Sequence, residues 1–190
     1  MPEDDSGDAL VAAFAQWAAG QRVDAAVAGR ARERSLREQA GAGATWTGVL
    51  LDLAERGAPV AIAAPGGRRR GRIVGVGPDF CVVALESGRP SLIALDALTQ
   101  IWPDPDRAGA RPDGGLAAGD REPALGLSFA AALAMLAEER SPVTLVTGAG
   151  EAVTGILIGA GEDVLTLQTD PPGRRIAHLP LGAVAACELR

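Results

Sequence analysis

Residues 71–83 read Gly-Arg-Ile-Val-Gly-Val-Gly-Pro-Asp-Phe-Cys-Val-Val, two runs of strand-forming residues around a turn. The turn is Gly77-Pro78-Asp79, three residue types that favour tight turns. Valine, isoleucine and phenylalanine on either side favour strands. Gly71 and Gly75 inside the first run are typical of bends and bulges. The segment therefore predicts a strongly bent pair of strands.

The same plan occurs twice along the chain. Residues 53–60 match residues 136–143. The match continues towards the end of the chain when one residue, and later two more, are treated as insertions in the second copy. The equivalent pairs include Trp46 and Phe129, Gly71 and Gly155, Asp79 and Asp163, Leu95 and Leu181, and Ala97 and Ala183. An ordered match of this kind predicts two copies of one structural unit.

Each unit is predicted to contain one helix and five short strands. Thr45 and Ser128 stand where an N-cap hydroxyl belongs, and Pro59 and Pro142 end the helices. The expected strands are 60–63, 70–76, 80–85, 91–94 and 98–101 in the first unit, and 143–146, 153–160, 164–169, 175–179 and 184–189 in the second. Leu165 and Leu167 alternate with polar residues, which predicts one buried face. By the match, Cys81, Val83 and Leu85 face inward in the first unit.

The predicted fold class is mainly β with α, an N-terminal helical segment followed by two small bent β-barrels. The expected domains are a helical segment over 1–44, a first barrel over 45–102, a Pro/Gly/Asp-rich linker over 103–126 and a second barrel over 127–190. Within the first segment, a helix over 8–40 carries an apolar stripe that includes Leu10, Phe14 and Trp17. The linker is long enough for the last strand of the first barrel to reach the second.

Composition excludes several classes of enzyme. The chain has 190 residues, 47% of them hydrophobic and 22% charged, as in soluble globular proteins. It contains no lysine, which excludes a P-loop lysine and Schiff-base chemistry. One histidine and two cysteines, Cys81 and Cys187, are too few for a structural zinc site. We expect no catalytic residues, no cofactor and no metal, and we expect Cys81 to be an inert core residue.

Charge and hydropathy bear on location and partners. No stretch has the ~18 apolar residues that a membrane span needs. The acidic start Met1-Pro2-Glu3-Asp4-Asp5 differs from a signal peptide, so we expect a cytoplasmic protein with reduced thiols. The net charge is −6. Only the region 46–101 has a slight positive balance, which disfavours non-specific nucleic-acid binding elsewhere.

The order of helix, bent strands and glycines in 45–101, and more weakly in 128–189, resembles the Sm-like (LSm) fold. The resemblance implies five-strand barrels in which the fourth strand of one unit pairs with the fifth of the next. It also implies base-binding residues that are missing here: the chain has no asparagine, and 94–97 reads Ala-Leu-Asp-Ala instead of carrying an Arg-Gly pair. The whole arrangement also resembles a family of uncharacterised actinobacterial proteins, some named Fis-family transcriptional regulators, but no helix-turn-helix tail is expected here.

The candidate binding residues are the arginines of the most basic run, Arg68, Arg69, Arg70 and Arg72. In a functional interpretation they hold phosphates, and in a structural one they form a solvated hairpin tip. Asp79 and Asp163 are expected to cap their own turns. His178 is expected at a strand rim, and Trp102 just outside the last strand, where it covers the barrel end or stacks on a base.

Two functions remain open from the sequence. The leading one is a non-enzymatic Sm-like interaction protein that acts through protein–protein contacts at strand edges, forming a homo-oligomer or binding a protein partner. The alternative is an RNA- or DNA-binding regulator that uses the Arg68–Arg72 loop.

Overall fold

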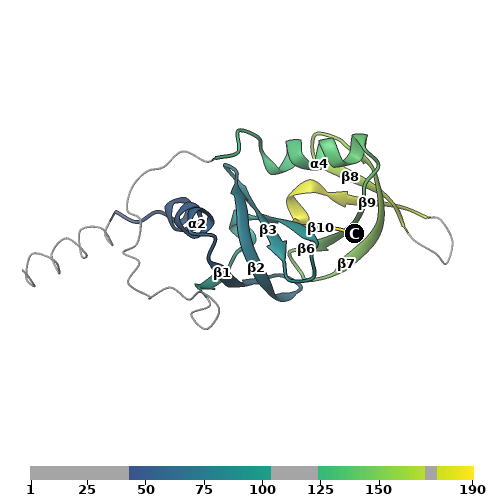
Figure 1. Cartoon of the computed structure of the whole chain (residues 1–190). Coiled ribbons are helices and arrows are strands. Elements are labelled where there is room, and N and C mark those ends of the chain that lie inside the picture. The colour runs from purple at the N-terminus through teal and green to yellow at the C-terminus, as the bar shows by residue number, and fades with distance from the viewer. Residues whose placement is uncertain (1–42, 104–123, 170–174) are drawn as a thin grey trace, which may run out of the picture.

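The computed structural model describes residues 43–103, 124–169 and 175–190, and within them the chain is mainly β with two helices (Figure 1). The predicted helix over 8–40 and most of the predicted linker lie outside the described residues. No helix in these ranges is both long and apolar enough to cross a membrane.

The first half of the described chain contains one helix and five strands. The elements are α2 (Trp46–Glu55), β1 (Pro59–Ala64), β2 (Gly67–Val76), β3 (Phe80–Leu85), β4 (Pro90–Ala94), the 3-10 helix η1 (Leu95–Ala97) and β5 (Gln100–Pro103). The last strand begins at Gln100, later than expected, because the Leu98 N–H bonds back to the Leu95 carbonyl of η1. Trp102 therefore lies inside β5, where it pairs with Ala61, and not beyond the last strand.

The second half repeats this order. Its elements are α4 (Phe129–Glu138), β6 (Pro142–Thr147), β7 (Ala152–Ala160), β8 (Val164–Thr169), β9 (Ile176–Pro180), the 3-10 helix η2 (Leu181–Ala183) and β10 (Val184–Leu189). Strand order is also the same, β5-β1-β2-β3-β4 in one half and β10-β6-β7-β8-β9 in the other. The predicted repeat is thus confirmed for the described elements.

The glycines that defined the repeat are required by a close approach of two strands. Gly71 pairs with Val60, and Gly155 pairs with Val143, so the two glycines hold the same register. A Cβ atom on Gly71 would lie 2.2 Å from the backbone oxygen of Ala84, and one on Gly155 would lie 2.3 Å from that of Gln168. A bulge follows in each copy, where the register with the next strand shifts. Only glycine allows this bend.

The two halves share one open, antiparallel ten-stranded sheet, because β4 pairs with β10. Leu92 faces Cys187 and Ile93 faces Ala186 across this junction. The expected pairing of a fourth with a fifth strand therefore occurs within the chain. It joins the fourth strand of the first half to the fifth strand of the second, whereas β5, which the linker is long enough to bring to the second half, lies at an outer edge. Pairing of β4 with β10 and pairing of β5 with β9 satisfy equivalent backbone groups, so the sequence did not distinguish the two arrangements.

Residues from each half fill the core of the other. Phe80 and Leu92 belong to the apolar cluster around α4, whereas Val146 and Ala186 belong to the cluster around α2. Neighbouring residues of a strand face opposite sides of the sheet, and at the junction both sides are covered. This explains why Ser91–Ala94 and Val184–Cys187 are buried without alternation. Cys81, Val83, Leu165 and Leu167 are buried, as predicted.

Both helices begin at the predicted caps. The Thr45 side chain accepts a hydrogen bond from the Gly48 N–H, and Ser128 accepts one from the Ala131 N–H. At the other end, the chain turns through a left-handed residue before each first strand. That residue is Gly57 (φ 58°) in the first half but Arg140 (φ 51°) in the second.

Replacing Arg140 with glycine should raise the free energy of unfolding by about 1 kcal/mol, because glycine carries no steric penalty in the left-handed region. Urea denaturation followed by circular dichroism measures the change. Gly57→Ala is the matched control, and it should lose a similar amount. A destabilised Arg140→Gly protein would contradict the explanation.

Candidate functional site

The contacts across the β4–β10 junction reach the start of α4. The Asp79 carboxylate (Oδ1) accepts a hydrogen bond of 2.7 Å from the Phe129 N–H, fifty residues along the chain. The rings of Phe80 and Phe129 pack with their centroids 5.9 Å apart. The prediction that the Asp79 side chain caps its own turn is therefore wrong. The N–H group at the start of α4, which has no partner within the helix, and the α4 dipole attract this carboxylate away from its own turn.

Removing this contact should cost about 1 kcal/mol of stability in Asp79→Ala, the usual loss for a side chain that caps a helix N–H. Chemical denaturation of the wild type and the variant measures it. Asp163→Ala is the matched control, because the Asp163 carboxylate meets no hydrogen-bond donor among the described residues. Equal losses in the two variants would show that the turn, and not the helix contact, is responsible.

Among the described strands, β5 and β9 are the outer edges of the sheet and lack the partner that β4 and β10 find in each other. Large apolar side chains are exposed near both ends. Trp46 at the start of α2 is 39% exposed, while its equivalent Phe129 is 6% exposed. Near β9, Ile176 is 52% and Val164 37% exposed. Trp46 and Val164 thus expose positions whose equivalents, Phe129 and Phe80, are buried at the inner junction, whereas Ile176 holds the place of Pro90, which is exposed there as well.

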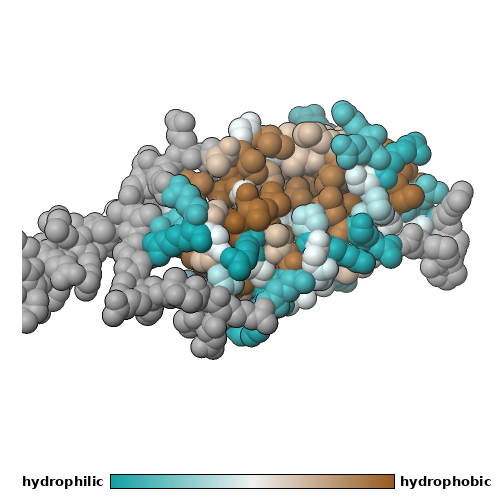
Figure 2. Space-filling model, in the orientation of Figure 1, coloured by the Kyte–Doolittle hydropathy of each residue, from teal (hydrophilic) through white to brown (hydrophobic). Residues whose placement is uncertain are grey.

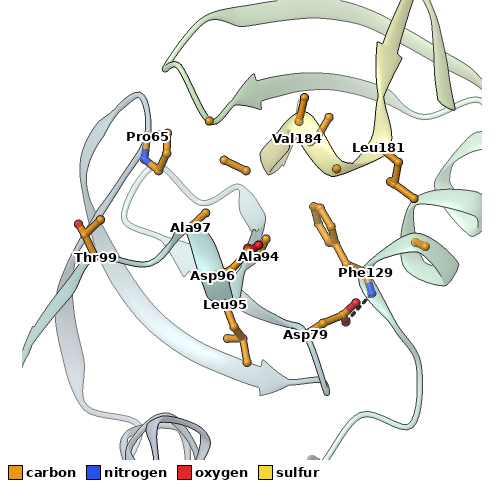
Figure 3. Close-up of a pocket in the computed structure, with 15 residues that line it drawn as sticks. Pro65, Asp79, Ala94, Leu95, Asp96, Ala97, Thr99, Phe129, Leu181 and Val184 are labelled. Atoms are coloured by element: carbon orange, nitrogen blue, oxygen red, sulfur yellow. Dashed lines mark hydrogen bonds between the residues drawn. The ribbon is translucent and has the colours of Figure 1, made fainter. Parts of the chain in front are cut away.

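A cleft of about 630 Å³ lies between the two halves. Its lining residues are Pro65, Asp79, Ala94, Leu95, Asp96, Ala97, Thr99, Phe129, Ala130, Gly148, Leu181, Gly182, Ala183, Val184 and Ala185. Figure 3 shows Phe129 beside Asp79 on one side, with η1 and the η2 segment on the others. In the face drawn in Figure 2, apolar surface gathers between α2 and α4, over the middle of the molecule.

The charge of the cleft disfavours phosphate. Asp79 and Asp96 line it, and no arginine or histidine belongs to the lining. The turn at Asp79 and residues 94–97 both line this cleft. With carboxylates and small apolar side chains there, the cleft would repel a phosphate backbone.

The arginine run is divided between the two faces of β2. Arg68, Arg70 and Arg72 are exposed and alternate along the strand. Arg68 lies over the Trp102 ring, 4.4 Å from its centroid, and Arg72 donates to the Gly57 carbonyl. Arg69 faces the opposite side, where its Nε donates to Glu188 of β10 at 2.7 Å. Arg69 therefore ties the two halves together and does not join the other three.

The remaining candidate side chains form no reactive cluster. His178 is exposed on β9, with its Nδ1 3.2 Å from the Thr166 hydroxyl. Cys81 and Cys187 are both fully buried and unpaired. Among the described residues, no three His, Cys, Asp or Glu side chains converge as metal ligands would.

The contact of Asp79 and Phe80 with Phe129 was not predicted from sequence. The available signal was the equivalence of Trp46 and Phe129, two large aromatic residues directly after the N-caps. That pattern shows that both helices begin with a bulky ring. It does not show where the ring packs, because the packing depends on which strands form the junction.

The chain matches no protein-family model, no curated protein and no solved structure.

Proposed function

We propose that this protein is a non-enzymatic, Sm-like interaction protein of two small bent barrels, whose copies join head to tail through their free sheet edges. The observation that supports it is the β4–β10 junction. Each strand of this junction has an equivalent at an outer edge, β9 for β4 and β5 for β10. The pairing of a fourth with a fifth strand is also what the Sm-like resemblance implies.

The contacts around the inner junction have counterparts at the two ends. Inside the chain, Asp79 accepts from the Phe129 N–H. At the outer ends the equivalent residues are Asp163, beside β9, and Trp46, at the start of α2. Among the described residues of one copy neither makes the counterpart contact, since Trp46 is exposed and the Asp163 side chain meets no donor. A second copy, placed as the second half is placed on the first, would bring the two together.

Such a contact joins different surfaces of the two copies. Repeating it produces a closed ring when the rotation closes and an open filament otherwise. Burial of Trp46 and Val164 favours association, because both expose apolar surface to water and their equivalents, Phe129 and Phe80, are buried at the inner junction. Pairing also satisfies backbone groups at both edges.

Blocking one edge tests the assembly. The Thr169 N–H bonds to the Arg175 carbonyl and the Leu181 N–H to the Asp163 carbonyl, so the backbone of residues 175 and 181 faces β8. By alternation, the backbone of residue 178 faces outward. His178→Pro therefore removes an outward backbone donor without breaking a backbone hydrogen bond to β8, although the side-chain contact of His178 with Thr166 is lost. Light scattering coupled to gel filtration should show oligomers for the wild type and 19.3 kDa monomers for this variant.

The opposite end is blocked by Trp46→Glu, with Met135→Glu as its matched control. Met135 is an exposed apolar residue of α4, 57% accessible, and its replacement should leave assembly unchanged. A mixture of Trp46→Glu and His178→Pro retains one intact end on each chain and should form dimers only. Failure of the mixture to dimerise, or a monomeric wild type at tens of micromolar, would refute the head-to-tail assembly.

A second candidate function, nucleic-acid binding, is favoured by the stack of Arg68 on Trp102. Arg70 and Arg72 lie on the same face, and β1, β2 and β5 contain no acidic residue. Guanidinium groups beside an aromatic ring are typical of single-strand binding. Three phosphate contacts predict about a 20-fold loss of affinity between 50 and 200 mM salt.

Fluorescence anisotropy with a labelled single-stranded RNA tests this second candidate. Arg68→Ala/Arg70→Ala should abolish the salt-dependent binding. Arg140→Gly/Arg175→Ala, which removes two charges elsewhere, should preserve it. No binding by the wild type at 50 mM salt would eliminate the candidate.

A further inference from the structure

We infer that His178 and Gln100 make the junction between copies weaker than the junction inside the chain, and so keep assembly reversible. The inference rests on the head-to-tail assembly proposed above. It concerns two positions at which a polar side chain of an outer edge stands where the inner strand has an apolar one.

Strand register identifies the positions. His178 pairs with Thr166 of β8, as Leu92 pairs with Val82 of β3. His178 therefore holds the place of Leu92. In the same way Gln100 pairs with Ala63 of β1, as Ala186 pairs with Val146 of β6. Gln100 holds the place of Ala186.

At the inner junction these places are apolar and buried in the core of the opposite half. Leu92 belongs to the cluster around α4 and is 8% exposed, and Ala186 belongs to the cluster around α2 and is fully buried. In a copy-to-copy junction, His178 would enter the cluster around α2 of the next copy. The groups facing it there would be Ile101, the equivalent of Cys187, and Trp46, the equivalent of Phe129.

The cost of this burial sets the strength of the junction. An imidazole or a carboxamide that leaves water for an apolar core loses hydrogen bonds that apolar neighbours do not replace. Both side chains are exposed in the single copy and pay no such cost there. With apolar residues at these two positions, the outer edge would associate as strongly as the inner strands do. An open strand edge of that kind promotes aggregation.

Replacing the two residues with their inner counterparts tests the inference. His178→Leu/Gln100→Ala should tighten self-association roughly 100-fold, because Leu92-like burial replaces polar burial. Sedimentation velocity over a concentration series measures the dissociation constant. Ala131→Leu adds an exposed apolar side chain on α4 without changing charge, and it should have no effect.

The outcomes separate this inference from the proposed function. Wild-type assembly that the double variant leaves unchanged would overturn the inference and leave the head-to-tail assembly standing. A monomeric wild type with an assembling double variant would refute the native assembly and, with it, the claim that the two residues keep that assembly reversible. If the wild type and the double variant are both monomeric, the assembly and the inference are both overturned. If Ala131→Leu also tightens self-association, the effect is non-specific hydrophobic association and the inference is overturned.

Discussion

Raising the pH from 8.5 to 10.5 should lower the free energy of unfolding by about 4 kcal/mol, through the thiols of Cys81 and Cys187. Burial raises the pKa of Cys81 from 9.0 to about 12. Burial, with a smaller effect of the neighbouring Glu188 carboxylate, raises the pKa of Cys187 from 9.0 to about 12.

The direction of the effect follows from where the protons are. Below about pH 9 both thiols are protonated in the folded and the unfolded chain, so their contribution to stability is complete. Between pH 9 and 12 the unfolded chain releases two protons that the folded protein retains, and rising pH favours unfolding. One unit of pKa shift corresponds to about 1.4 kcal/mol. Two units of pH, begun just below the unfolded pKa, therefore remove about 2 kcal/mol per thiol.

Because of the composition, no side chains other than these two thiols are expected to titrate between pH 8.5 and 10.5. The chain contains no tyrosine and no lysine, and arginine keeps its charge throughout this range. Urea denaturation at the two pH values measures the difference. Cys81→Ala/Cys187→Ala removes both titrating groups, so its stability should be lower at pH 8.5 but nearly independent of pH. An equal fall in this variant would assign the alkaline loss to another cause.

The repeated unit was predictable because its determinants are local. Turn residues at 77–79, glycines that permit bends and hydroxyl caps before each helix all act within a few residues of themselves. The position of the inserted residues was also correct, since they fall in the β1–β2 and β3–β4 connections and their equivalents. The sequence did not determine which fourth strand pairs with which fifth strand, because β4–β10 and β9–β5 pairing satisfy equivalent backbone groups.

In the candidate site, side-chain directions were predictable only for residues that lie inside a predicted strand, where side chains alternate between the two faces. The expected second strand began at residue 70, which left Arg68 and Arg69 in a loop with no defined direction. In the structure β2 begins at Gly67, so alternation places Arg68, Arg70 and Arg72 on one face and Arg69 on the other. The partner of Arg69, Glu188, lies 119 residues away in sequence. No periodicity connects residues at that separation.

Phe129→Ala should lower the free energy of unfolding by about 3–5 kcal/mol, the range for removing a large buried aromatic side chain. Phe129 is 6% exposed and packs against Phe80 of the first half. Its removal opens a cavity where the two halves meet. Met135→Ala on the same helix is the matched control, and it should change stability by less than about 0.5 kcal/mol because Met135 is exposed.

The loss should appear in both halves at once. The only tryptophans besides Trp17 are Trp46 and Trp102, both in the first half, whereas Phe129 belongs to the second. In a Trp17→Phe background, tryptophan fluorescence therefore reports on the first half and circular dichroism on the whole. Because Phe80 and Leu92 fill one core while Val146 and Ala186 fill the other, neither half retains a complete core alone. We expect the two signals to shift to the same lower urea midpoint in Phe129→Ala; a fluorescence midpoint that stays at its Trp17→Phe value would mean that the halves unfold independently.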